Sequence, residues 1–209
     1  MTSFMKLGNA HGRFKGIRPV LYFSRLHNRD LFTTSKVQLS NNSNETFEDS
    51  TYKGLFYHLT NDMTNYLLSF ISDPSKVARN EIAIIGWVAA HEKVPKLKLQ
   101  SFKENKKFEK FLHQVIADNV ATADLQLQAL AKYQKDGWLN IADARDPPPW
   151  GRIPFPEDIF GVVQVRNGKI VPGTYQSMPT HRILTSKGLF ILSDPLHRKL
   201  LEKLNEICQ

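Results

Sequence analysis

From about Tyr52 onward, apolar side chains recur with the periods of helices and strands, so we expect the folded domain to begin there. Residues 61–72 carry apolar side chains at helical spacing behind a cap at Thr60 or Asn61, which predicts a short helix. The run 81–90 is compact, partly β-branched and interrupted by a glycine, and these features favour a buried strand.

Residues 102–119 form a strongly amphipathic segment. Ser101 and Glu104 have the spacing of a capping box, in which the two side chains accept hydrogen bonds from free backbone N–H groups at a helix start. The pattern therefore predicts a helix over 102–119. It either continues or breaks near Thr122 and restarts, and Gly137 ends it.

The last third of the chain predicts short strands joined by tight turns. Residues 137–142 and 159–166 have the length and alternation of strands. Asn167-Gly168 then predicts a type I′ hairpin turn, because both central residues of that turn need a positive φ. A second hairpin is expected within 181–192.

Ser193 and Pro195 have the positions of a cap and a first helical residue, and they predict a C-terminal helix. Its buried stripe is expected to consist of Leu196, Leu200, Leu204 and Ile207. Together these elements predict an α+β fold with a small, mainly antiparallel sheet and segregated helices.

Charge is distributed unevenly along the chain. Of its 28 basic and 20 acidic side chains, seven basic and one acidic lie in residues 1–39, so this leader carries six of the eight net positive charges. At helical spacing Arg18, Arg25 and Arg29 share one face. A basic, acid-poor, amphipathic leader indicates a mitochondrial presequence that directs the protein to the matrix. A basic tail that binds anionic surfaces nonspecifically is the alternative.

Residues 40–51 are rich in Asn, Ser and acids and predict a disordered linker, which leaves 52–209 as a single domain. No segment approaches the ~18 apolar residues of a transmembrane helix, so we expect a soluble mature protein. Cys208 is the only cysteine, which excludes disulfides and thiolate clusters within one chain.

The segment 143–158 concentrates acids, arginines and prolines around one tryptophan. We interpret it as a rigid platform that presents Trp150 and Arg152 to a partner, because aromatic and arginine side chains dominate binding hot spots. The alternative is a structural connection, with Trp150 in the core and Arg152 paired with Asp146 or Glu157.

His181 and Arg182 are candidates for an acid/base and anion-binding pair, with His181 the best single catalytic candidate. A hairpin-edge histidine that bonds the backbone is the alternative. With Tyr175, Trp150 and Arg152, the pair completes the predicted binding surface. The spacing of the histidines predicts no metal site, and the lack of a phosphate-binding loop motif predicts no nucleotide cofactor.

Four lysines, Lys103, Lys106, Lys107 and Lys110, share the polar face of the predicted 102–119 helix. Cations near a helix start are disfavoured by a few tenths of a kcal/mol each. An anionic partner, either RNA or an anionic lipid surface, would explain their position, and an ordinary solvated face is the alternative.

The stretches Trp150-Gly-Arg-Ile-Pro, Pro156-Glu-Asp-Ile-Phe-Gly and Tyr175-Gln-Ser-Met-Pro resemble a group of uncharacterised fungal mitochondrial proteins. The resemblance covers about two-thirds of the chain and implies a compartment but no reaction, cofactor or site. We therefore predict a mitochondrial accessory or interaction protein that binds a protein partner. A small enzyme acting on an anionic metabolite and an RNA or mitoribosome-associated factor are the alternatives.

Overall fold

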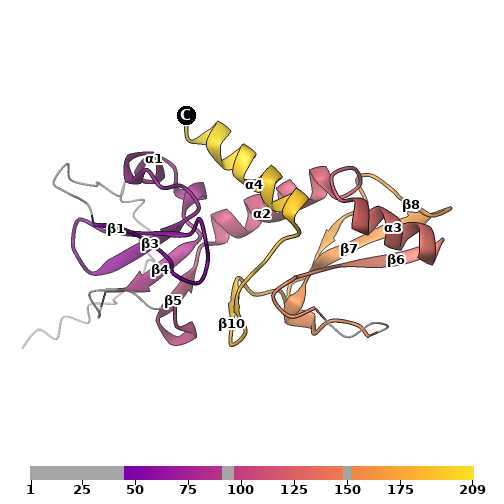
Figure 1. Cartoon of the computed structure of the whole chain (residues 1–209), viewed down its shortest axis with the longest axis horizontal. Helices are drawn as coiled ribbons and strands as arrows, with labels where there is room; N and C mark the ends of the chain where they lie inside the picture. The colour runs from indigo at the N-terminus through magenta and orange to yellow at the C-terminus, as the bar shows by residue number, and fades with distance from the viewer. Residues whose placement is uncertain (1–44, 91–96, 148–151) are drawn as a thin grey trace, which may run out of the picture. The chain divides into compact units, whose positions relative to one another are not determined.

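The computed structural model describes residues 45–90, 97–147 and 152–209. Contacts within the chain divide it into two units, residues 1–34 and 35–209, and every described residue belongs to the second. The second unit contains α-helices and antiparallel sheets (Figure 1), which confirms the predicted α+β class. Within the described residues, no helix has the length and apolar character needed to cross a membrane.

The first sheet is an antiparallel meander in which each strand pairs with the next along the chain. Its strands are β1 (Thr46–Glu48), β2 (Phe56–Leu59), β3 (Asn65–Ser69), β4 (Gly86–Ala89) and β5 (Phe102–Glu104). The central strand β3 is buried on both faces, because Leu67 and Leu68 are both fully inaccessible to solvent. Both faces of the meander are therefore covered along this strand.

The helix predicted over 61–72 is wrong, since β3 occupies this segment. A strand that is buried on both faces has a continuous apolar run, and such a run cannot be told from a helical face by its period alone. Met63 has φ 54° in the turn that precedes the strand. Residues 40–44 of the predicted linker 40–51 lie outside the described residues, whereas within its later part β1 pairs with β2 and Phe47 packs against Tyr66.

The helix predicted over 102–119 begins later than expected, as α2 (Lys106–Asn119). Ser101 ends a short 3₁₀ turn, η2 (Leu99–Ser101), and Asn105 caps α2 by accepting a hydrogen bond from the Lys107 N–H. The run 81–90 is divided between a 3₁₀ turn, η1 (Glu81–Ala83), and the strand β4, and it follows the short helix α1 (Pro74–Arg79).

Two further α-helices, α3 and α4, follow α2 along the chain. Of the two alternatives for the end of the 102–119 helix, the break near Thr122 is the one present, and α3 (Leu125–Gln134) follows it. The C-terminal helix α4 (Asp194–Ile207) contains Pro195 in its first turn and lies beside α2 (Figure 1). Three residues of the predicted α4 stripe are buried, whereas Ile207 at the end of the helix is partly exposed.

The second sheet is built on the long strand β7 (Ile159–Arg166). It pairs antiparallel with β6 (Gly137–Ala142), β8 (Lys169–Ile170) and β9 (Gln176–Ser177). The strands predicted at 137–142 and 159–166 are thus present with the predicted bounds. A 3₁₀ turn, η3 (Pro156–Asp158), precedes β7, and the second hairpin is reduced to the ribbon β10 (Leu184–Thr185) and β11 (Gly188–Leu189).

An aromatic cluster connects the parts of this core. Phe108 on α2 and Phe190 after β11 have ring centroids 6.0 Å apart, and each lies within 6.5 Å of the Phe70 ring. Phe160 on β7 packs edge-on against Phe190 at 6.1 Å. The first sheet, α2 and the second sheet therefore contribute side chains to one apolar cluster.

The Asn167-Gly168 turn has the predicted geometry, with φ 48° and 72° at its two residues. We expect Gly168→Val to lower the free energy of unfolding by about 1–3 kcal/mol, because a β-branched residue is strained at positive φ. A Cβ at this position would also lie 3.2 Å from the Lys132 Cα. Urea denaturation measures the loss, and Asn167→Gly, which tolerates positive φ, is the control expected to retain parental stability. An unchanged midpoint for Gly168→Val would contradict the turn assignment.

Candidate functional site

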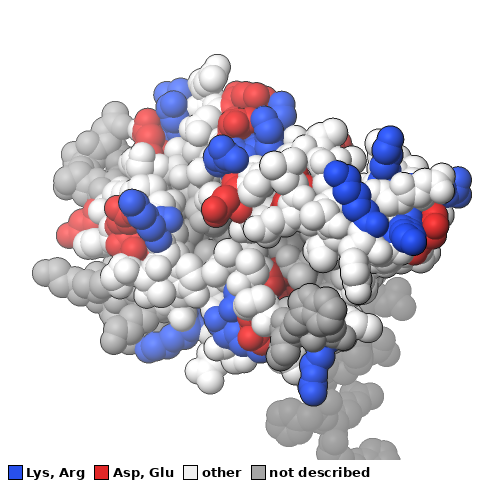
Figure 2. Space-filling view, turned by 45° about the vertical axis from the view of Figure 1, so that its right-hand side comes forward, with Lys and Arg blue, Asp and Glu red and all other residues white. Residues whose placement is uncertain are grey.

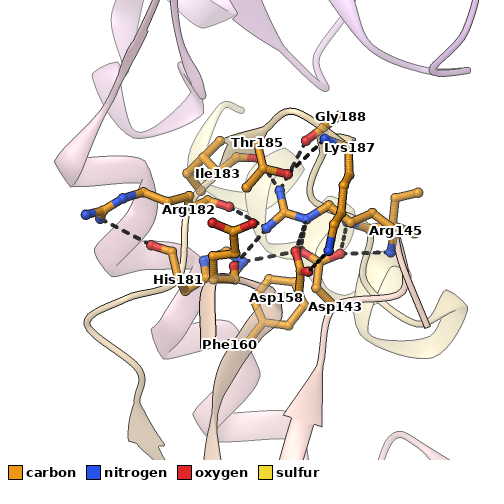
Figure 3. Close-up of polar contacts among 12 residues, drawn as sticks. Asp143, Arg145, Asp158, Phe160, His181, Arg182, Ile183, Thr185, Lys187 and Gly188 are labelled. Carbon is orange, nitrogen blue, oxygen red and sulfur yellow. Dashed lines mark hydrogen bonds and ion pairs between the residues drawn. The ribbon is translucent and has the colours of Figure 1, made fainter. Parts of the chain in front are cut away.

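Arg145 occupies the centre of a buried polar cluster beneath the β10–β11 ribbon (Figure 3). Its side chain is only 1% exposed. The Nε–H donates to Asp158 Oδ1 at 2.8 Å, and Asp143 Oδ2 lies 3.4 Å from the same nitrogen. Two carboxylates therefore compensate one buried guanidinium, as a buried charge requires.

The remaining N–H groups of Arg145 donate to backbone carbonyls. Nη1 donates to Gly188 at 3.1 Å and to Ile183 at 3.4 Å, whereas Nη2 donates to Glu157 at 2.9 Å and Arg182 at 2.8 Å. The planar guanidinium has five donors, and all five point at protein acceptors. Arg145 thus joins η3 to the segment 182–188 and has no donor left for a ligand.

Lys187 extends this cluster toward the surface. Its ammonium lies 2.8 Å from Asp158 Oδ2 and 2.6 Å from Asp146 Oδ2, and it stands 4.2 Å above the Phe155 ring. Burial tends to raise the pKa of the Asp158 carboxyl, but hydrogen bonds from Lys187 and Arg145 outweigh it and hold that pKa below its ordinary value. The Asp158 carboxylate is therefore ionised and paired at neutral pH.

His181, the predicted catalytic candidate, lies inside the protein. Its Nε2 is 3.3 Å from Asp143 Oδ2, and its ring packs on Phe160 with centroids 4.4 Å apart. Asp143 Oδ1 also accepts hydrogen bonds from the Arg145 and Ile191 N–H groups. Nδ1 of His181 has no hydrogen-bond partner among the residues that the structure describes. The Asp143–His181 pair is therefore buried, and neither residue lines the cavities found among the described residues.

Tyr175 is half-buried, and the His113 ring lies 6.1 Å from the rings of both Tyr175 and His181. Its hydroxyl donates to the Phe160 carbonyl at 3.0 Å, so the His113 Nδ1–H must donate to the Tyr175 oxygen at 2.8 Å. A Cβ at Gly161 would come within 2.6 Å of the Tyr175 ring, so the glycine is what admits this ring. Burial, followed by repulsion from His181, lowers the pKa of His113 to about 4.

Arg182 has the opposite orientation to its neighbour His181, and its guanidinium points away from the buried cluster (Figure 3). Among the described residues the Arg182 side chain makes a single long hydrogen bond, from Nη1 to the His181 carbonyl at 3.4 Å. It borders an open cavity of about 540 Å³. The cavity is lined by Leu99, Phe102, Glu104, Lys106, Glu157, Arg182, Leu184, Thr185 and Ser186.

The four described residues of the predicted binding surface differ in their exposure. His181 is buried and Tyr175 half-buried, whereas Arg182 and Arg152 are exposed. Arg152 has no polar partner within the described ranges, and Asp146, one of its proposed partners, pairs with Lys187 instead. Trp150 lies outside the described residues.

The four predicted lysines belong to two elements. Lys103 lies on β5, where its ammonium is 6.0 Å from the Trp87 ring, and the other three lie on α2. Lys106 pairs with Glu109 at 2.6 Å, and Lys107 pairs with Glu81. Lys110 is exposed. Carboxylates therefore offset two of these four positive charges.

Among the described α-helices, α3 carries the most exposed apolar side chains. Leu125 is 75% exposed, Leu130 49% and Tyr133 77%, and Ala129 lies between them on the same face. The opposite face packs inward through Ala131, which is fully buried. Sequence periodicity alone could not show which face of this helix would be left uncovered.

Cationic side chains surround one end of α3 (Figure 2, right). They are Lys132, Lys135, Arg166 and Lys169, all of them exposed. The Asn167-Gly168 turn brings them together, because the Gly168 N–H donates to the Lys135 carbonyl at 2.7 Å and the Asn167 N–H donates to Asp136 Oδ1 at 3.0 Å. Sequence analysis did not single out this group, whose members are as much as 37 residues apart.

The described residues contain no group of three or more His, Cys, Asp or Glu side chains arranged to hold a metal ion. Comparison of the chain with protein-family models, with curated proteins and with solved structures found no match.

Proposed function

We propose that this protein is a mitochondrial accessory factor that binds a protein partner through α3. The observation that carries the proposal is the exposed apolar face of this helix, formed by Leu125, Ala129, Leu130 and Tyr133 and called the α3 face below. Single exposed apolar residues are ordinary, whereas several contiguous ones on a helix mark interaction surfaces.

The energetics favour covering this face. Burying one leucine side chain stabilises a complex by about 1.5–3 kcal/mol, and tyrosine is enriched among binding hot spots. Leu125, Ala129 and Tyr133 follow one another at intervals of four residues, which is the spacing by which a helix presents anchors to an apolar groove. An apolar groove or helix on a partner is the surface that fits this face.

The charges around the α3 face indicate an acidic partner. Lys132 lies in α3 and Lys135 follows the last residue of the helix, whereas Arg166 and Lys169 lie on the adjoining β7–β8 hairpin. Like charges across an interface cost several kcal/mol, whereas complementary charges accelerate association. We expect carboxylates on the partner around a central apolar contact.

The alternatives have less support. An acid/base enzyme requires a titratable group beside its substrate, but His181 is enclosed and does not line the cavity that Arg182 borders. An RNA-binding protein requires a continuous basic surface, but Lys106 and Lys107 are paired with carboxylates. RNA remains an outcome that the experiment below distinguishes.

The mitochondrial location is supported by the leader. Residues 1–39 combine a net charge of +6 with arginines that share a helical face, as import signals do. The leader lies outside the described residues, so its sequence alone carries this part of the proposal.

Site-specific photocrosslinking tests the proposed interface. A photoreactive phenylalanine analogue at Tyr133 is expected to crosslink the partner in isolated mitochondria, whereas the same analogue at Met63, an equally exposed turn residue, is not. Leu125→Asp should weaken the complex with the crosslinked protein by about thirtyfold, and Met63→Asp should leave it unchanged. Equal crosslinking at both positions, or binding that ribonuclease abolishes, would contradict the proposal.

A further inference from the structure

The cavity beside Arg182 combines charged and apolar walls. Its volume of about 540 Å³ lies within the range of small-molecule sites. One side is formed by η2, β5 and the first residue of α2, and the other side by η3 and the segment 182–186. None of its lining residues belongs to the α3 face, so the cavity is a separate feature of the molecule.

Charges of both signs line this cavity in equal number, namely Arg182 and Lys106 against Glu104 and Glu157. Glu104 and Lys106 are engaged within the protein. Glu104 Oε1 accepts the Ile183 N–H at 2.9 Å, its Oε2 lies 3.6 Å from Lys106, and Lys106 also pairs with Glu109. The charges of these two side chains are therefore already paired within the protein.

Arg182 and Glu157 are the two charged side chains that remain. Their backbones are adjacent, because the Arg182 N–H donates to the Glu157 carbonyl at 3.3 Å. Their side chains form no ion pair with each other or with any other described residue. The cavity thus offers one available guanidinium and one available carboxylate.

The other lining residues define a less polar region. Leu99, Phe102 and Leu184 supply apolar surface, and Thr185 and Ser186 supply hydroxyl groups. A phosphate or another polyanion would face two carboxylates and would leave this apolar surface without a contact. A ligand with both charges and an apolar body matches all three features of the cavity.

We propose that the cavity binds a small zwitterion with an apolar side chain, the chemical class of a free amino acid. Its carboxylate accepts hydrogen bonds from the Arg182 guanidinium, which can bind a carboxylate bidentately. Its ammonium donates to the Glu157 carboxylate, and its side chain packs against Phe102 and Leu184. The inference does not depend on the partner proposed for the α3 face.

Calorimetric titration of the full chain with three related probes tests this inference. L-phenylalanine carries both charges, its N-acetyl derivative only the carboxylate, and its amide only the ammonium. We expect L-phenylalanine to bind at least tenfold more tightly than either derivative. Equal affinities for the three probes, or no binding of L-phenylalanine at millimolar concentration, would overturn the inference.

Two variants assign each charge to its partner. Arg182→Gln should weaken the binding of L-phenylalanine about tenfold and leave the binding of the amide unchanged, because the amide has no carboxylate for Arg182 to bind. Glu157→Gln should weaken L-phenylalanine and leave the N-acetyl derivative unchanged. Arg198→Gln, which changes an exposed arginine on α4 outside the cavity, is the matched control and should bind all three probes like the parent.

The variants also provide checks on folding and on independence. Both side chains are exposed, so thermal unfolding of each variant should match the parent. If Arg182→Gln proved unstable, the Glu157→Gln comparison would decide alone. A variant that binds all three probes like the parent would overturn the role assigned to that residue. Neither substitution should change photocrosslinking at Tyr133, so the two proposals are tested independently.

Discussion

Arg145→Met is expected to lower the free energy of unfolding by about 3–5 kcal/mol, the loss typical when one partner of a buried ion pair is removed. The variant leaves the Asp143 and Asp158 carboxylates buried without their common partner. It also leaves four carbonyls without the donors that Arg145 supplies. Because a domain has only about 5–15 kcal/mol of stability, the loss should be plain in urea denaturation.

Two comparisons separate this effect from a general loss of charge. Arg145→Lys retains the charge but has three donors on one nitrogen instead of a planar fork, so it should recover only part of the stability. Arg152→Met removes an exposed arginine of the same region and should change stability by less than about 0.5 kcal/mol. An Arg145→Met variant as stable as Arg152→Met would show that the cluster does not hold η3 to the segment 182–188.

Asn105→Ala is expected to destabilise the protein by about 2–4 kcal/mol, as the sum of a lost helix cap and two lost hydrogen bonds to backbone carbonyls. The buried Asn105 amide accepts the Lys107 N–H at 3.0 Å, and its Nδ2 donates to the Glu81 and Ile84 carbonyls at 2.7 and 2.6 Å. One side chain therefore starts α2 and ties it to η1.

The matched control is Ser101→Ala, which removes the hydroxyl predicted from sequence to cap this helix. In the structure that hydroxyl donates to the Lys98 carbonyl at 3.2 Å on an exposed turn. We expect its loss to shift the thermal midpoint little, whereas Asn105→Ala should lower it clearly. Equal shifts for the two variants would contradict the assignment of Asn105 as the cap.

The contrast between these two residues explains one error of sequence analysis. Ser101 and Glu104 have the spacing of a capping box, but Ser101 directly precedes β5 and Glu104 lies in it, and β5 pairs with β4. Glu104 instead accepts a hydrogen bond from the Ile183 N–H, a residue 79 positions away. A capping motif is local, and a competing nonlocal pairing does not appear in its spacing.

The candidate site shows the same limit. His181 and Arg182 are adjacent in sequence and were predicted to act together, yet the backbone directs one inward and the other to the surface. Arg145 was not selected, because nothing in its own segment shows that the carbonyls of 182–188 surround it. The acids of the 143–158 segment were the one available signal, since a buried arginine needs carboxylates near it.

The sequence by itself determined the features that depend on neighbouring residues. These are the α+β class, the strands at 137–142 and 159–166, the Asn167-Gly168 turn and, to within one residue of Pro195, the start of α4. Each follows from a local period, a positive φ or a missing N–H, which are properties of a few consecutive residues.

Only the tertiary structure decided which side chains are available for binding. It buried His181, left the α3 face uncovered, and placed Glu157 beside Arg182 at the edge of one cavity. Burial and unpaired charge depend on contacts between residues far apart in the chain. Several arrangements of the same local elements are compatible with one hydrophobic pattern, and long-range packing selects among them.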